Sequence, residues 1–188
     1  MKNTYRIGAA GVAMIAALGL ASAAHAAPVT ASADARAEIV KALTVVKDTD
    51  LDFGKIAITG AAGTVTVDPD GTVSNCDASL TCYSTTTGAK FDVTTGSAGK
   101  TLTVSLPADA VLLRAGGTVG NAADELELSS YTTDATDNGG VYNVVLVDDG
   151  TATGNGIASF SIGGTLSFDG SELEGVYTAT ISVDVDYS

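Results

Sequence analysis

Apolar and polar residues alternate along much of this chain, and no stretch after residue 26 carries a convincing 3.6-residue apolar repeat. Many apolar positions hold β-branched residues, which is typical of strands. The segments expected to be strands are 64–67, 91–94, 101–106, 141–147, 157–168 and 176–187. The turn signals between them lie at 68–71, 96–99, 137–140 and 155–156. Short strands at this spacing predict an all-β fold, an antiparallel sandwich or barrel.

Residues 29–40 form a candidate donor strand, a segment suited to completing the sheet of another domain. Its apolar residues occupy every odd position, and they are Val29, Ala31, Ala33, Ala35, Ala37 and Ile39. A strict period of two places all six on one face of a strand. Residues 33–43 also have the alanine content of a helix, but the alternation favours the strand.

The last segment has the same design with larger side chains. After Gly175, one face carries Tyr177, Ala179, Ile181, Val183, Val185 and Tyr187. Because this segment ends the chain, we expect it at a sheet edge, where unpaired backbone groups can accept another strand. If residues 29–40 pair with their own domain, the product is a monomeric sandwich. If they pair with a neighbour, each subunit completes the next and a head-to-tail filament follows.

The first 26 residues have the order of a secretory signal peptide. Lys2 and Arg6 precede an apolar run at 7–20, and Ala24-His25-Ala26 is a cleavage signature. The rival interpretation, a membrane anchor, fits less well because the run is rich in Ala and Gly and marginally long enough to span. Residues 27–188 suit a single domain with a sizeable core, secreted through the periplasm to the cell surface.

Charge and composition narrow the function classes. Cleavage removes two positive charges and no acid, so the net charge changes from −13 to −15, which disfavours binding to nucleic acid or to an anionic membrane. His25 is the only histidine and leaves with the signal peptide, which excludes most Ser-His, Cys-His and His-metal chemistry. No acid is marked out as a catalytic pair and no Gly-rich phosphate loop opens a helix, so we expect no enzyme and no cofactor.

Two further features have a structural and a functional interpretation. Cys76 and Cys82 are a lone, close pair in a secreted chain, which predicts a disulfide that staples a loop. A redox or zinc role would need a C-x-x-C motif or more ligands.

The acidic strings 68–71 and 134–138 resemble fragments of calcium loops, but their Asp, Asn and Gly residues favour ordinary turns over a weak surface Ca²⁺ site.

The C-terminal residues resemble those of chaperone–usher pilins. In that family the last strand carries a Gly fourteen residues from the end and a penultimate Tyr, the positions of Gly175 and Tyr187. The strings at 51–54 (Leu-Asp-Phe-Gly) and 163–166 (Gly-Gly-Thr-Leu) are similar to a family of secreted proteobacterial β domains of unknown function, related in style to spore-coat-U-like pilins. The resemblance implies an incomplete immunoglobulin-like sandwich, a periplasmic chaperone that binds the last strand, an outer-membrane usher, and polymerisation by donor-strand exchange.

Two departures from the pilin pattern stand out. Pilins join cysteines that lie far apart on two early strands, and their donor segments carry bulky alternate residues where this chain has Ala. Because the two terminal segments are complementary, we still expect a structural subunit of a pilus-like filament built from copies of this chain. The assembly residues are Val29, Ala31, Ala33, Ala35, Ala37, Ile39, Gly175, Ile181, Val183, Val185 and Tyr187. The alternative is a monomeric secreted adhesin or coat protein whose sandwich is completed by its own N-terminal strand.

Overall fold

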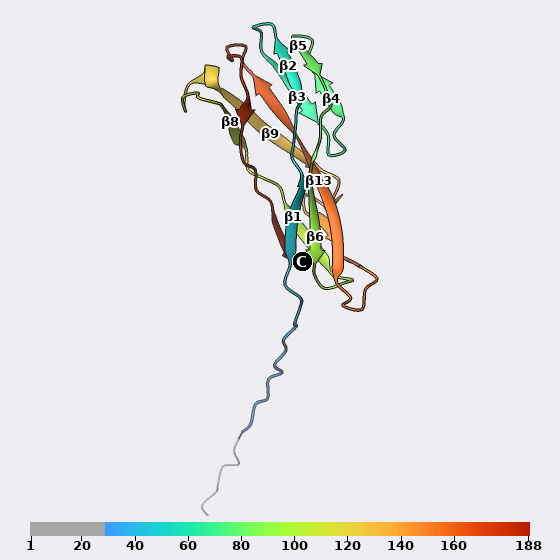
Figure 1. Ribbon diagram of the computed structural model, residues 1–188. Coiled ribbons are helices and arrows are strands. Elements are labelled where there is room, and N and C mark those ends of the chain that lie inside the picture. Colours follow the sequence, from blue (N-terminus) through green and yellow to red (C-terminus); the bar gives the residue numbers. More distant parts are fainter. Residues whose placement is uncertain (1–28) are drawn as a thin grey trace, which may run out of the picture. The chain divides into compact units, whose positions relative to one another are not determined.

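The computed structural model describes residues 29–188 (Figure 1), so the expected signal peptide lies outside the described residues. The chain divides into two units, one that ends at Ala37 and one that runs from Glu38 to Ser188. In the first unit, residues 29–37 form neither strand nor helix. The second unit is all-β and antiparallel, with one short 3₁₀ helix, η1 (Ala122–Asp124). In the described part of the chain, no helix has the length and apolar content needed to cross a membrane.

The strands form one large sheet and two small ones. The strands are β1 (Thr44–Thr49), β2 (Lys55–Ile58), β3 (Gly63–Val67), β4 (Val73–Cys76), β5 (Leu80–Tyr83), β6 (Ala89–Thr95), β7 (Thr101–Ser105), β8 (Ala110–Arg114), β9 (Glu125–Thr133), β10 (Thr136–Asp137), β11 (Tyr142–Val145), β12 (Val147–Asp148), β13 (Gly156–Phe168), β14 (Tyr177–Thr178) and β15 (Asp184–Tyr187). The large sheet has the order β1-β6-β13-β9-β8-β14, with β3, β4 and β12 attached beside it. The smaller sheets are β10-β11-β7-β15 and β2-β5.

The long strand β13 organises the large sheet (Figure 1). Its first half pairs with β6 and its second half pairs with β3 along the same edge, while β9 pairs with the opposite edge. Gly163 lies where the partner changes from β6 to β3. A Cβ at this position would lie 2.2 Å from the carbonyl oxygen of Val67, so only glycine lets the two backbones approach this closely.

Two apolar clusters fill the interior. One cluster lies around β3, β9 and the second half of β13, and its largest buried side chains include Phe53, Leu128 and Phe168. The other lies between the large sheet and β7, where Phe160 and Ile162 face Leu102 and Val104. Side chains from two facing sheets enclose this second cluster, so the predicted all-β antiparallel sandwich is confirmed. Leu51, Tyr131 and Ile181 contact both clusters and join them.

Most of the predicted strands are present, and two are interrupted. The segment 141–147 divides at Leu146 into β11 and β12, because the Leu146 amide donates to the carbonyl of Lys100 and its side chain is fully buried. The segment 176–187 divides into β14, which pairs with β8, and β15, which pairs with β7. A single continuous strand at 176–187 is therefore wrong, because the segment passes from one sheet to another. The turn expected at 155–156 is also wrong, since Gly156 begins β13.

Candidate strand-acceptor groove

A groove of about 620 Å³ with an apolar floor lies between the N-terminal and C-terminal parts of the Glu38–Ser188 unit. One wall is the chain from Lys47 to Phe53, at the end of β1 and just beyond it. The other wall is the chain from Val176 to Ile181. The floor consists of the large apolar side chains Phe91, Leu112 and Leu128, with the smaller Ala89. We call this hollow the acceptor groove.

Both walls of the acceptor groove offer unpaired backbone. β1 is the last strand of the large sheet, and only its β6 side is paired. Residues 179–183 belong to no strand, and within residues 29–188 no backbone hydrogen bond joins them to another segment. Unpaired amides and carbonyls along an apolar hollow are a template for an additional strand.

The C-terminal wall keeps the alternation that the sequence predicted, although it is not one strand. Ile181, Val183, Val185 and Tyr187 are partly buried, and all four pack against the second cluster. Ala179, on the same predicted face, is exposed and lines the acceptor groove. Ala179, the smallest side chain on this face, therefore lies where the apolar interior opens into the acceptor groove.

The ion pair between Arg114 and the buried Asp124 lies where the C-terminal wall begins. Asp124 is 4% exposed and its carboxylate accepts hydrogen bonds from the Thr118 amide at 3.0 Å and from Arg114 Nε at 2.6 Å. These two hydrogen bonds hold the pKa of Asp124 below its usual value, and the bond from the Thr118 amide has the larger effect. Gly175 lies against the stem of Arg114, where an added Cβ would come within 2.7 Å of Arg114 Cγ. The sequence singled out Gly175 by its position alone, and its packing on Arg114 gives the physical reason for glycine.

The motif at 51–54 lies in the other wall. Leu51 and Phe53 point into the apolar interior, and the Asp52 carboxylate accepts the Gly54 amide at 2.8 Å. Gly54 has φ +71° and an added Cβ would lie 2.7 Å from the carbonyl oxygen of Tyr83, so the turn requires glycine. The four residues together turn the chain from β1 toward β2 while Leu51 and Phe53 stay beneath the acceptor groove.

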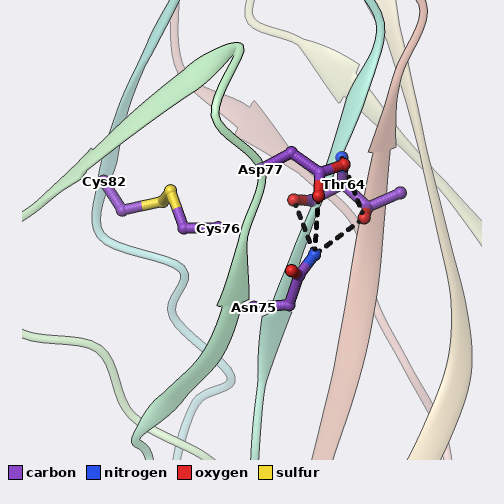
Figure 2. Close-up of a disulfide and its surroundings, with 5 residues drawn as sticks. All are labelled: Thr64, Asn75, Cys76, Asp77 and Cys82. Carbon is purple, nitrogen blue, oxygen red and sulfur yellow. Dashed lines mark hydrogen bonds between the residues drawn. A yellow bond between two sulfur atoms is a disulfide. The ribbon is translucent and has the colours of Figure 1, made fainter.

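The predicted disulfide between Cys76 and Cys82 is present and joins the end of β4 to β5 (Figure 2). Beside it, the Asp77 carboxylate accepts the Thr64 amide at 2.7 Å, and the Asn75 side-chain amide donates to Thr64 and to Asp77 (Figure 2). The hydrogen bond from the Thr64 amide is the main reason why the pKa of Asp77 lies below its usual value. The disulfide therefore links the large sheet to the small β2-β5 sheet, next to a polar network that fixes the start of β3.

Residues 29–40, the candidate donor strand, are exposed in the structure. They form neither strand nor helix, and the exposed fraction is 98% for Val29 and 95% for Ile39. Their proposed role in pairing between subunits stays a prediction.

The acidic strings act as turns in the structure. Asp70 Oδ1 accepts both the amide and the hydroxyl of Thr72, which lowers the pKa of Asp70, and Asp137 Oδ1 accepts the Gly140 amide at 2.7 Å. Asp134 instead accepts the amide of Ser161 in β13 at 2.7 Å. Across residues 29–188 no three His, Cys, Asp or Glu side chains come together as metal ligands would.

A second hollow of about 420 Å³ lies at the far end of β13. Its acidic lining residues are Asp109, Glu125, Glu127, Asp169 and Glu172. Two of these carboxylates support loops, since Glu172 accepts the amides of Asp169 and Gly170 and Glu125 accepts the amide of Gly120. These hydrogen bonds give both side chains a structural role.

The fold and the groove define an antiparallel all-β domain with an open sheet edge. The chain belongs to the family described as a domain of unknown function (DUF4402), whose model matches residues 43–187. The match begins one residue before β1 and covers every strand, whereas the candidate donor strand lies outside it. No curated protein and no solved structure matches the chain.

Sequence reasoning missed two of the three large floor residues, Leu112 and Leu128. Leu112 lies in β8 and Leu128 in β9, and neither strand was expected. A signal for β9 was present, because Glu125-Leu126-Glu127-Leu128 alternates strictly. For β8, the run Val111-Leu112-Leu113 has no alternation that would show which side chain faces inward.

Proposed function

We propose that this protein is a structural subunit of a pilus-like surface filament, in which the acceptor groove of one copy receives residues 29–40 of the next. The observation that supports this most strongly is a groove with an apolar floor and unpaired backbone on both walls, in a chain that also carries an exposed segment of period-two alternation. Addition of a strand satisfies the backbone groups of the walls and covers the apolar floor.

The shape of the groove suits the small side chains of the donor. Phe91, Leu112 and Leu128 already supply bulk at its floor, so the inserted strand need contribute mainly methyl groups along its inner face. Each buried methyl stabilises by about 0.8 kcal/mol, and each new backbone hydrogen bond by about 0.5–1.5 kcal/mol. The alternating Ala residues from Ala31 to Ala37 therefore fit, and the backbone supplies much of the affinity.

The direction of the two walls determines the kind of assembly. At the Thr44 end of β1 the chain lies beside Tyr187, while at the Thr49 end it lies beside the Val176–Ile181 wall, so the two walls are antiparallel. A donor that pairs antiparallel to the C-terminal wall, the more stable arrangement, runs from the Thr44 end to the Thr49 end. Its own domain then follows at the Thr49 end of the acceptor. The contact therefore joins opposite ends of two copies. Because such a head-to-tail contact does not close on itself, copies add one after another into a filament.

The remaining parts of the proposal come from the sequence. The N-terminal 26 residues support export, and the groove offers a periplasmic chaperone the same strand edge before assembly, with an outer-membrane usher as the exit route. Assembly itself needs no cofactor and no catalytic group. We infer a secreted, cell-surface location on this basis.

The experiment compares the mature chain, residues 27–188, with the same chain lacking residues 27–40. Both are purified from the periplasm and observed by size-exclusion chromatography and negative-stain microscopy. We expect the mature chain to form filaments whose ladders in SDS collapse only on boiling, and the shortened chain to stay monomeric with unchanged circular dichroism. A sharp monomer peak for the mature chain at high concentration would refute the filament, and unfolding of the shortened chain would show that residues 27–40 are an integral strand.

A further inference from the structure

The chain that leads from the candidate donor strand into β1 is fastened at Lys41. The Lys41 amide donates to Ser97 Oγ at 2.8 Å, and the Lys41 carbonyl accepts the Tyr187 hydroxyl at 2.7 Å. Its Nζ donates to the carbonyls of Thr153 and Gly154 at 2.7 and 2.8 Å. The amide, the carbonyl and the side chain of Lys41 are thus all hydrogen-bonded.

Tyr187 is the centre of this arrangement, which we call the Tyr187 clasp. Its hydroxyl also accepts the Ser97 amide at 2.8 Å, so one oxygen connects the start of β1 to the turn after β6. Gly96 makes room for it, because an added Cβ there would lie 3.1 Å from Leu43 Cδ2 and 3.3 Å from the Tyr187 hydroxyl. The ring itself packs against the second apolar cluster, which fixes the position of the hydroxyl.

Two partners of Lys41, Ser97 and the loop at 153–155, hold it on the paired side of β1, while Tyr187 reaches it from β15 in the other sheet. Ser97 follows β6, and the loop at 153–155 leads into β13, so both belong to strands on the side of β1 that already has partners. For residues 29–39 to fill the acceptor groove of their own copy, the chain must reverse within residues 40–43 and run along the other side of β1. A reversal this short needs the backbone groups of Lys41 for its own turn.

We infer that Tyr187 is a positioning residue for assembly, which commits residues 29–40 to a neighbouring copy by holding Lys41 in a conformation that excludes the self-filling hairpin. The inference rests on the proposed function, and it adds that the choice between filament and closed monomer is made at the Tyr187 hydroxyl. The penultimate tyrosine thus acts on the segment that leads into the candidate donor strand of its own chain.

The test uses full mature chains at a concentration at which they are monomeric, with a fluorescent synthetic peptide of residues 29–40 as the probe. The variants are Tyr187→Phe, which removes only the hydroxyl, and Ser97→Ala, which removes the acceptor of the Lys41 amide. Tyr142→Phe is the matched control, because Tyr142 packs in the same cluster and has no hydrogen bond within the described residues that fixes Lys41. Circular dichroism verifies the fold of each.

Wild-type and Tyr142→Phe chains should bind the peptide equally, because their grooves are open. Tyr187→Phe should bind it about tenfold more weakly, since two hydrogen bonds no longer oppose self-filling and the competent fraction falls accordingly. Ser97→Ala should also weaken peptide binding. If Tyr187→Phe does not fold, the affinity of Ser97→Ala tests the inference in its place. Equal binding by all four chains overturns the clasp and leaves the filament proposal intact, whereas no binding by the wild type overturns the filament proposal itself.

Discussion

A single charge placed on the inner face of the donor strand separates the proposed assembly from a generic association of acidic subunits. Ala33 is exposed in the structure, so Ala33→Asp should leave the folding of the domain unchanged. In the acceptor groove the same carboxylate would face Phe and Leu side chains, beside a wall that already carries Asp50 and Asp52. An unpaired buried carboxylate costs several kcal/mol, and about 3 kcal/mol is already more than a hundredfold in the association constant.

The assay is the critical concentration for filament growth, measured by light scattering after addition of sonicated filament seeds. Ser32→Asp is the matched control, because it adds the same charge one position away on the opposite face. We expect Ala33→Asp to raise the critical concentration by more than about a hundredfold, and Ser32→Asp by less than about threefold because its charge stays in water. Equal effects of the two substitutions would refute insertion of this face into an apolar groove.

Three further predictions concern the fold that supports the groove. Replacing Cys76 and Cys82 by Ser should lower the free energy of unfolding by about 2 kcal/mol, the value expected for so short a loop, and urea denaturation with unchanged spectra would measure it; no loss would show that the staple is dispensable. Gly163→Ala should cost about 1–3 kcal/mol because its Cβ meets a backbone carbonyl 2.2 Å away, whereas Gly164→Ala, which meets a side chain at 3.0 Å, should cost less; the reverse order in thermal melts would contradict the packing. Because the pKa of Asp124 is lowered by folding, its stabilisation is present above the ordinary carboxyl pKa and is lost as pH falls through the lowered value, so denaturation curves of Asp124→Asn should show a smaller loss of stability below about pH 4 than those of the wild type; parallel curves would refute the linkage.

Period-two patterns predicted which side chains face inward more reliably than which strands form. The inward face of the last segment held from Ile181 to Tyr187, because burial depends on the side of the chain that is apolar. The interruption at residues 179–183 depends on which strand lies opposite, and β7 and β8 are far away in sequence. No local pattern carries that information.

The acceptor groove also combines features that the sequence predicted with features that it did not. The alternation of its C-terminal wall was predicted, although not its division into two strands, and its proposed occupant, residues 29–40, stays a prediction. Its floor was not predicted, because Leu112 and Leu128 come together only when β8 and β9 pair. The disulfide needed no fold at all, because the short spacing of Cys76 and Cys82 places the two thiols within reach of each other.

The division of β13 between two partners has a consequence for how the protein folds. Val67 and Gly164 are neighbours in the sheet, so the first third of the chain waits for the last third to be made before its edges are covered. Long-range pairings of this kind fold on the scale of milliseconds to seconds, and strands left unpaired in that interval adhere to one another. A chain of residues 27–188 refolded from urea should therefore lose more material to aggregates as its concentration rises. A peptide that binds early to the edge of β3 should raise the yield of native domain.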